Sequence, residues 1–396
     1  MPDTKIPAAT AKTGDGPRVT ATRTPVWGRA LRILAWLSFI SETIIIGTGG
    51  AVRLTGSGLG CSEWPLCTPE SLVPIYADQG VHGLIEFGNR LMTGVVGIIA
   101  LAVVLLVIST IGGRRHLVRS LWFALGGIAG AVVAYSVSKY VLSSVAAVFD
   151  DLAFPFATGV LLLAVIAAAV HSVRTAPDRR DLVALAWIVL AGVVAQALVG
   201  GITVLTGLNP FIVGFHYTSS LLLVCVTAAF LVRLYAVPGR RELAVPTWFA
   251  ALSHLTGLAL AVTILFGVLT TGSGPHSGDA AVLREGFDAT VLAHVHAWPG
   301  YILAGLVLVL TISAWTLRLR PRKWLLVLVL AILVQVGVGI WQAREGLPPL
   351  LVGIHMVLAA LSAATYTVVV LHLRRPVAAS VGSDADADAV DAVTAH

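Results

Sequence analysis

Apolar residues occur along this chain in long runs that short clusters of charged residues separate. A hydrocarbon layer about 30 Å thick requires roughly 20 apolar residues for each helical crossing. Each of these runs therefore predicts a membrane-spanning helix. Ten are present, at about 33–52, 91–111, 121–138, 152–173, 182–205, 211–232, 248–270, 291–315, 324–341 and 350–372. The fifth and sixth are separated at 207–210, where glycine and proline interrupt the helix.

The composition agrees with this pattern. Of the 396 residues 57% are hydrophobic and 12% are charged, whereas a soluble domain is about half apolar and about a quarter charged. We therefore expect an all-α polytopic membrane protein with about ten transmembrane helices. The net charge of +6 arises from short clusters between the spans, without the basic, aromatic-interleaved patch that would indicate nucleic-acid binding.

The positions of lysine and arginine predict the orientation. Of these 26 residues, 21 lie on the side that contains both termini and five on the other. Cytoplasmic loops carry the excess of positive charge, so we expect both termini, including the segment 1–32, in the cytoplasm. The tail 376–396 is rich in alanine and aspartate, which predicts a disordered, solvated end.

The chain contains an internal repeat. Residues 196–216 align without a gap on 335–355, and Gln, Gly, Gly-Leu, Pro, Val-Gly and His coincide at an offset of 139. The sequence TGSG at 55–58 recurs at 271–274. Two homologous four-helix bundles follow, at 33–236 and 247–373, an arrangement that membrane proteins use to build a site between repeats.

The first bundle is longer than the second. Between TGSG and the glutamine of the repeat lie 137 residues in the first half and 60 in the second. This difference predicts an inserted helical hairpin of two spans at about 115–178. The hairpin resembles neither half, and we assign it no chemistry.

Polar residues within the spans are candidates for function because they are costly in a membrane. His216 and His355 occupy one position of the repeat, each six residues after a helix-starting proline. His296 begins the eighth span, and Asn89 holds the equivalent place in the second. Facing histidines suit axial ligation of a haem, so His296 and His355 form a candidate pair. In the first half His216 faces Asn89, a poor iron ligand, which would leave one coordination position open.

Other polar residues have two readings. His82, Glu86 and Asn89 are spaced i, i+4 and i+7, which places them on one helix face. Glu86 is a candidate for chemistry, although its pairing with Arg90 at i+4 is nearly as favourable an explanation. A single interfacial histidine is more often hydrogen-bonded than a ligand, but the repeat makes a shared role for His216 and His355 the better reading. Glu42 we expect to be neutral and hydrogen-bonded.

Two of the three cysteines, Cys61 and Cys67, lie together in an outward loop as CSEWPLC. On the oxidising face of a membrane such a pair predicts a disulfide. Cys225, alone in the sixth span, is interpreted as a small packing residue.

Taken together, GGAVRLTGSGLGC at 49–61, WP at 64–65, IEFGNR at 85–90, GGITVLTG at 200–207 and GPHSGD at 274–279 resemble the haem A synthase family, in its actinobacterial form. The resemblance implies oxidation of a methyl group of haem O to the formyl group of haem A, for assembly of the terminal oxidase in the bacterial cell membrane. It implies a haem b cofactor on His296 and His355. It also implies that the first bundle binds haem O near the outer face, with iron on His216 and an essential Glu86.

The same resemblance leaves several points open. The family motif E-x-x-H-R has Asn89 in place of its histidine here, and the usual member has eight spans. The substrate iron is therefore held either by His216 alone or by His216 with His82, in a pocket that includes Asn89 and Arg90. The cysteine pair is redox-active or structural.

Expected partners are haem O, membrane lipid, haem O synthase, assembly factors of the terminal oxidase and a second copy of the chain. The competing interpretations are a b-type dihaem subunit that transfers electrons or oxidises quinol, and a transporter built on the repeat.

Overall fold

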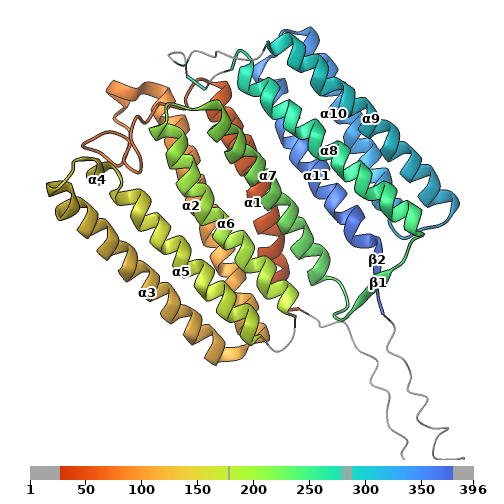
Figure 1. Ribbon diagram of the computed structural model, residues 1–396, viewed down its shortest axis with the longest axis horizontal. Helices are drawn as coiled ribbons and strands as arrows, with labels where there is room; N and C mark the ends of the chain where they lie inside the picture. Colours follow the sequence, from red (N-terminus) through yellow and green to blue (C-terminus); the bar gives the residue numbers. More distant parts are fainter. Residues whose placement is uncertain (1–26, 177–178, 277, 280–281, 283–287, 378–396) are drawn as a thin grey trace, which may run out of the picture.

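The computed structural model describes residues 27–176, 179–276, 278–279, 282 and 288–377. Within these ranges the chain forms long helices that pack side by side (Figure 1), and ten are long and apolar enough to cross a membrane. The predicted all-α polytopic fold is therefore confirmed. The elements are α1 (Arg29–Leu54), α2 (Tyr76–Ile111), α3 (Gly113–Tyr140), η1 (Leu142–Ser144), α4 (Val148–Asp151), α5 (Ala153–Thr175), α6 (Arg180–Leu205), α7 (Pro210–Leu234), β1 (Arg241–Leu243), α8 (Thr247–Ser273), α9 (Ala289–Thr316), α10 (Arg322–Arg344), α11 (Pro349–His372) and β2 (Arg374–Pro376).

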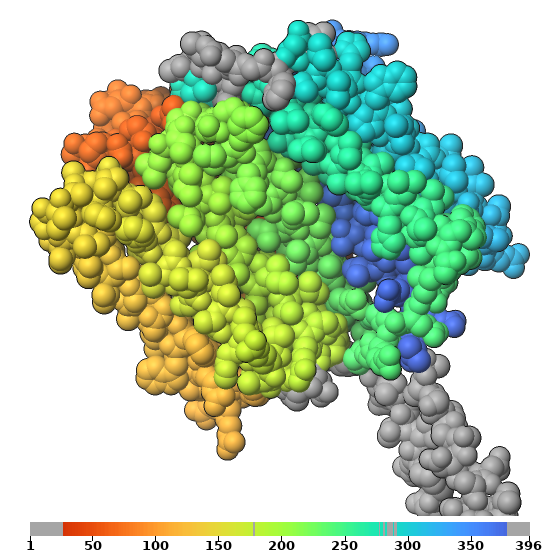
Figure 2. All heavy atoms as spheres, in the orientation of Figure 1, coloured from red at the N-terminus to blue at the C-terminus, as the bar shows by residue number. Residues whose placement is uncertain are grey.

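The helices form two bundles of four. In the first bundle α1, α2, α6 and α7 pack around one another, and in the second α8 packs on α9, α9 on α10 and α10 on α11. The bundles meet where α1 and α7 contact α11. Figure 2 shows α11, in blue, between the first bundle and α8. One helix of the second bundle therefore lies directly against two helices of the first.

The inserted hairpin consists of α3 and α5, which pack closely on each other. It lies beside α6 and α2, at the edge of the molecule farthest from the second bundle (Figure 1). The short helices η1 and α4 connect its two arms. Because the hairpin is added from outside, the four helices of the first bundle keep their mutual contacts.

The internal repeat is visible in the backbone. Gly207 and Leu208 have φ angles of 60° and 59°, and their counterparts Gly346 and Leu347 have 73° and 64°. The N–H group of each leucine donates to a carbonyl five residues earlier, at 2.8 Å in the first turn and 2.7 Å in the second. Such left-handed closures are common at helix C-termini, and Pro210 or Pro349 then begins the next helix.

Two apolar cores lie mainly toward the end where α1 begins, one within the first bundle and one in the second bundle that extends onto α1 and α7. In the first bundle the core includes Val104, Val107 and Leu182, and in the second Phe249 and Leu310, all 0–1% exposed. At the opposite end, where α1, α6, α8 and α10 finish, the interior contains cavities in which a few polar side chains lie among apolar ones. We call this end the cavity end.

The short β-ribbon was not predicted. Strands β1 and β2 pair antiparallel beyond the ends of α7 and α11, and Arg375 Nε lies 2.8 Å from Glu242 Oε1. Pro376 and Val377, predicted to begin the tail, belong to or extend this ribbon. The rest of that tail and the first 26 residues of the N-terminal segment lie outside the described residues.

Candidate functional site

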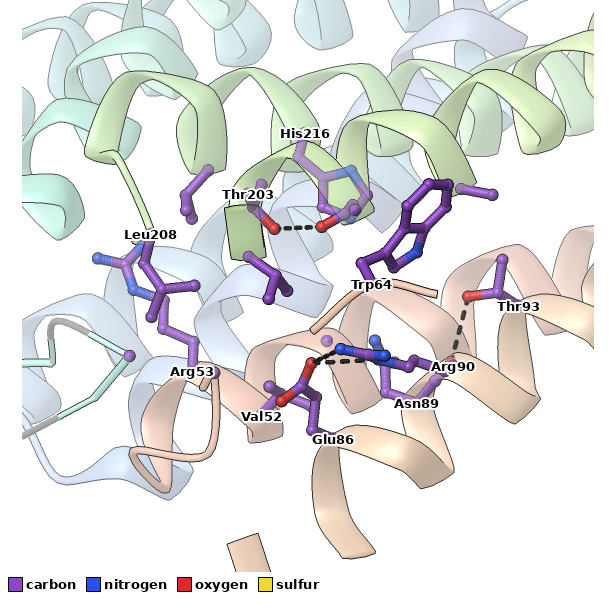
Figure 3. A pocket seen from close by; sticks show the side chains of 18 of the residues that line it. Val52, Arg53, Trp64, Glu86, Asn89, Arg90, Thr93, Thr203, Leu208 and His216 are labelled. Atoms are coloured by element: carbon purple, nitrogen blue, oxygen red, sulfur yellow. Dashed lines mark hydrogen bonds and ion pairs between the residues drawn. The ribbon is translucent and has the colours of Figure 1, made fainter. Parts of the chain in front are cut away.

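The first bundle contains a cavity of about 280 Å³ at the cavity end. Four of the predicted site residues line it, namely Glu86, Asn89, Arg90 and His216. In Figure 3, His216 and Trp64 lie on one side of this outer cavity, and Glu86, Asn89 and Arg90 lie across from them. The structure therefore brings together residues from α2, α7 and the loop that follows α1.

His82 was also predicted to belong to this pocket, but it is not one of the described residues that line the cavity. Helix α2 begins at Tyr76 and does extend through positions 82, 86 and 89. The Nδ1 atom of His82, however, lies 2.9 Å from Ser57 Oγ, in a hydrogen bond to the TGSG segment. The backbone of Gly60 also packs against the His82 carbonyl, and no side chain fits at position 60. This loop separates His82 from the cavity.

His216 lies in the second turn of α7. The helix starts at Pro210, and the Asn209 side chain caps it by accepting the Phe211 N–H at 3.0 Å. The imidazole faces Gly200 of α6, where a methyl group would lie 3.4 Å from Cε1. Its Nδ1 is buried without a hydrogen-bond partner, so within the described chain nothing fixes which ring nitrogen carries the proton.

Asn89 lies opposite His216. The hydroxyl of Thr48 donates to Asn89 Oδ1 at 2.8 Å and fixes the orientation of the amide. Gly49 of α1 lies beside it, with 3.9 Å between a methyl at that position and Oδ1. The Nδ2 group of the same amide is a hydrogen-bond donor and has no lone pair to offer a metal.

Glu86 is buried, with 5% of its surface exposed. One carboxylate oxygen is 2.5 Å from Arg90 Nη2, and the other accepts the Cys61 N–H at 2.6 Å. The ion pair between Glu86 and Arg90, which their i, i+4 spacing suggested, is therefore present. Because Glu86 and Arg90 both line the cavity, the pair belongs to the site.

Arg90 and Glu86 also hold the loop between α1 and α2. The Arg90 guanidinium donates to the carbonyls of Cys61, Glu63, Pro65 and Leu66. The predicted disulfide joins Cys61 to Cys67, and neither cysteine is exposed. Trp64, at the tip of this loop, packs so closely on Gly201 of α6 that no side chain fits there. The loop therefore covers the outer cavity.

A second, inner cavity of about 120 Å³ lies deeper in the same bundle. Asn89, Gln196 and His216 line both cavities. The inner cavity reaches Glu42 near the middle of α1. Contrary to the expectation that this carboxyl is hydrogen-bonded, its Oε1 is buried without a partner.

The second bundle contains a third cavity, of about 140 Å³, lined by His296 and His355. The centroids of the two imidazole rings are 6.2 Å apart and their planes are nearly perpendicular, at 83°. A metal–imidazole bond is about 2 Å long, so two rings on opposite sides of one metal ion have centroids roughly 6 Å apart. His296 Nδ1 is 2.9 Å from the Thr263 carbonyl, a contact that leaves Nε2 available as a ligand.

The same contact between a glycine and a site residue occurs in four helix pairs. In each pair a glycine of one helix lies against the candidate residue of the next; a methyl group in its place would crowd the imidazole at Gly267 and Gly339 and would be in ordinary contact at the other two. The pairs are Gly49 with Asn89, Gly200 with His216, Gly267 with His296 and Gly339 with His355. Sequence reasoning found Gly200 and Gly339 through the repeat, but not their function as space for the rings.

Side-chain hydrogen bonds of Tyr217 and Arg53 connect the bundles beside these sites. The hydroxyl of Tyr217 donates to the carbonyl of Met356 at 2.9 Å. These residues follow His216 and His355 and are themselves equivalent in the repeat. The guanidinium of Arg53, which lines all three cavities, donates to the carbonyls of Thr271 and His276 in the second bundle.

Comparison with known proteins gives one match over most of the chain. The model of the cytochrome oxidase assembly protein family matches residues 32–148 and 156–361. A protein named heme A synthase from Exiguobacterium sibiricum is 38% identical over 78 residues, 19% of this chain and 25% of that protein. A heme A synthase from Bacillus cereus is 40% identical over 72 residues, 17% and 22% of the two chains.

A relative with another name matches to a similar extent. The protoheme IX farnesyltransferase of Thermus thermophilus is 39% identical over 84 residues, which is 21% of this chain and 13% of that protein. The chain thus spans about a quarter or less of the length of these curated relatives.

Proposed function

We propose that this chain, which belongs to the cytochrome oxidase assembly protein family, is a haem A synthase that oxidises a methyl group of haem O to the formyl group of haem A. The observation that carries the proposal is the outer cavity, where one candidate iron ligand, His216, and a buried carboxylate, Glu86, line the same space. The relatives named heme A synthase support it.

His216 would bind the iron of the substrate, and the opposite position would stay open. Asn89 presents an amide there, which is a poor iron ligand, and the bond to Ser57 holds His82 outside the cavity. Of the two alternatives for the substrate haem, this geometry favours His216 as the sole axial ligand. A ligand position left open next to the cavity is what chemistry on the substrate requires.

Glu86 would act on charge and protons near the methyl group that is oxidised. Arg90 and the Cys61 N–H contact its two oxygens, and a carboxylate stabilises positive charge that develops beside it. A proton taken up there would reside on one carboxylate oxygen. The loop that carries Trp64 shields part of the cavity from bulk water, which strengthens these electrostatic interactions.

The residues of the second bundle fit a haem b cofactor. The 6.2 Å ring separation, the buried Nδ1 of His355 and the missing space for a side chain at Gly267 all suit two imidazoles that would hold one haem. His296 and His355 would hold the group, which when bound supplies electron transfer. Arg53 lies between the cavities, where its guanidinium suits a carboxylate such as a propionate.

The protein would lie in the bacterial cell membrane with both termini in the cytoplasm and the cavities near the outer face. The distribution of lysine and arginine supports this orientation. Haem O synthase would supply the substrate, consistent with the relative named protoheme IX farnesyltransferase. Assembly factors of the terminal oxidase, lipid and a second copy of the chain complete the proposed partners.

Substitution of Glu86 tests this function. Membranes that contain haem O and the variant Glu86→Gln should form no haem A, while haem B remains bound to the protein. The control is Glu242→Gln, which removes a carboxylate of the ribbon at the other end of the molecule and should leave haem A formation unchanged. Extracted pigments are identified by chromatography.

Two results would overturn the proposal. If Glu86→Gln forms haem A as the unchanged protein does, the role of Glu86 is wrong. If the unchanged protein contains haem B alone even when haem O is supplied, the protein is an electron-transfer subunit rather than a synthase.

A further inference from the structure

The inner cavity of the first bundle contains a carboxyl group that the proposed reaction has not used. Glu42 lies near the middle of α1 and is 2% exposed, and its Oε1 makes no hydrogen bond to the described chain. An ionisable side chain at this depth of a membrane is costly. An unpaired polar atom that is buried in this way costs free energy. The free oxygen of Glu42 therefore needs a polar partner, such as water, within the cavity.

The wall of this cavity is suited to water. Gln196 Nε2 donates to Ser219 Oγ at 2.6 Å, and Ser220 Oγ lies 3.2 Å from Gln196 Oε1 and 2.8 Å from the His216 carbonyl. The side chains of Asn89 and Thr93 also line it. A water molecule requires about 10–15 Å³ of such volume and two or more polar partners, so a cavity of about 120 Å³ has room for several.

The inner cavity lies directly against the outer one. His216, Asn89 and Gln196 line both, and Glu86 lines the outer one. The titratable and charged groups that face the inner cavity are Glu42, Arg53, His216 and Tyr217. Arg53 is engaged with carbonyls of the second bundle, and Glu42 is the one carboxyl group among these residues.

We propose that Glu42 is a proton-exchanging residue of the substrate site, a role that rests on the function proposed above. Its carboxyl group is protonated at rest and gives its proton to water in the inner cavity when negative charge increases at the substrate, while that water passes a proton on toward the outer cavity. When the charge decreases, a proton returns through the same water to the carboxylate. The O–H bond of Glu42 breaks as an O–H bond to the water forms, the water releases one of its own protons, and no electron moves in this step.

Infrared spectroscopy of the purified full-length protein, without haem O, tests the exchange directly. A protonated Glu42 that contacts water should give a carboxylic C=O band that shifts when H₂O is replaced by D₂O. The band should be absent from Glu42→Gln and present in Glu242→Gln. A band that does not shift in D₂O, or that persists in Glu42→Gln, would overturn the proposal.

Haem A formation tests the role in the reaction. General acid–base groups contribute about 10²–10⁴-fold, so a group that acts through water should cost Glu42→Gln about tenfold or more in rate, while Glu42→Asp keeps part of the activity. Binding of haem O should be unchanged in both. Formation of haem A at the unchanged rate in Glu42→Gln would overturn the proposal.

If Glu42→Gln does not accumulate, Glu42→Asp and the D₂O shift of the unchanged protein together show whether Glu42 exchanges protons. Absence of haem A from the unchanged protein would overturn the proposed function instead, and the infrared result would still decide whether Glu42 exchanges protons.

Discussion

At the scale of single residues, the glycines beside the site residues set how closely neighbouring helices approach. A methyl group at position 267 would lie 2.9 Å from His296 Cε1, and one at 339 would lie 3.2 Å from His355 Cε1. Both separations are shorter than the 3.5–4.0 Å at which carbon atoms pack best. Either substitution would therefore move the imidazole that faces it.

We predict that Gly267→Ala and Gly339→Ala weaken haem b binding, with Gly267→Ala the more severe. Overpacking a well-filled interior costs about 1–3 kcal/mol, which corresponds to roughly 5–150-fold in affinity. The control is Gly337→Ala, which lies on α10 like Gly339 and where a methyl group meets no atom within 4 Å. It should bind haem b normally and be slightly more stable, since alanine favours helices. Equal haem content in all three variants would show that these glycines do not position the ligands.

The sequence predicted some of the site residues and missed others for identifiable reasons. The repeat located His216 and His355 because both follow the same Gly-Leu turn and proline. The helical spacing of His82 was read correctly. It could not reveal that Ser57 and the segment around Gly60 cover that turn of α2. Trp64 was missed because the contact between a loop tip and a distant glycine has no local signal.

At the scale of elements, the loop between α1 and α2 depends on one side chain of α2. Arg90 donates to four carbonyls of the loop and pairs with Glu86, which itself accepts the Cys61 N–H. An arginine can make this set of bonds because its guanidinium has five donors in a plane, whereas the lysine ammonium has three on one atom. The position of the loop over the outer cavity is thus coupled to the site.

We predict that Arg90→Lys makes the disulfide easier to reduce. Both cysteines are buried, so a reductant reaches them when the loop opens. Loss of bonds to a charged group, each about 1.5–3 kcal/mol, should raise the open population about tenfold or more. The measurement is the number of alkylated thiols, beyond that of Cys225, after graded treatment with a phosphine. Arg344→Lys, an exposed arginine at the end of α10, is the control. Reduction of the disulfide at the same rate in both variants would contradict the proposal that Arg90 keeps the loop closed.

The helices were predicted correctly where a long apolar run defines them, and elements without such a run were missed. The ten spans were recognised, yet α2 starts at Tyr76, 15 residues before its predicted run, because its first turns are polar and rest on the loop. Gly80, with φ of 57°, kinks this extension. The β1–β2 ribbon consists of three-residue strands, too short to show an alternating pattern.

At the scale of the whole molecule, the two bundles are related by the repeat and joined near their sites. The repeat places Tyr217 and Met356 at equivalent positions, directly after His216 and His355. Both line the inner cavity of the first bundle and the cavity of the second. The hydrogen bond between them therefore crosses the wall that separates the inner cavity of the first bundle from the candidate haem b site of the second. The hairpin of α3 and α5 contributes no described residue to the three large cavities.

This arrangement predicts that occupancy of one site is sensed at the other. In the unchanged protein, addition of haem O should shift the absorption maximum of haem b, because α7 and α11 move together through the Tyr217–Met356 bond. Tyr217→Phe should reduce this shift while it lowers stability by only about 0.6 kcal/mol, the typical value of a hydrogen bond between membrane helices. Tyr366→Phe is the matched control, since its hydroxyl donates to the Ser253 carbonyl within the second bundle.

If the two variants retain the same shift as the unchanged protein, the coupling does not pass through Tyr217. If Tyr366→Phe loses the shift equally, the effect reflects loosened packing rather than contact between the bundles.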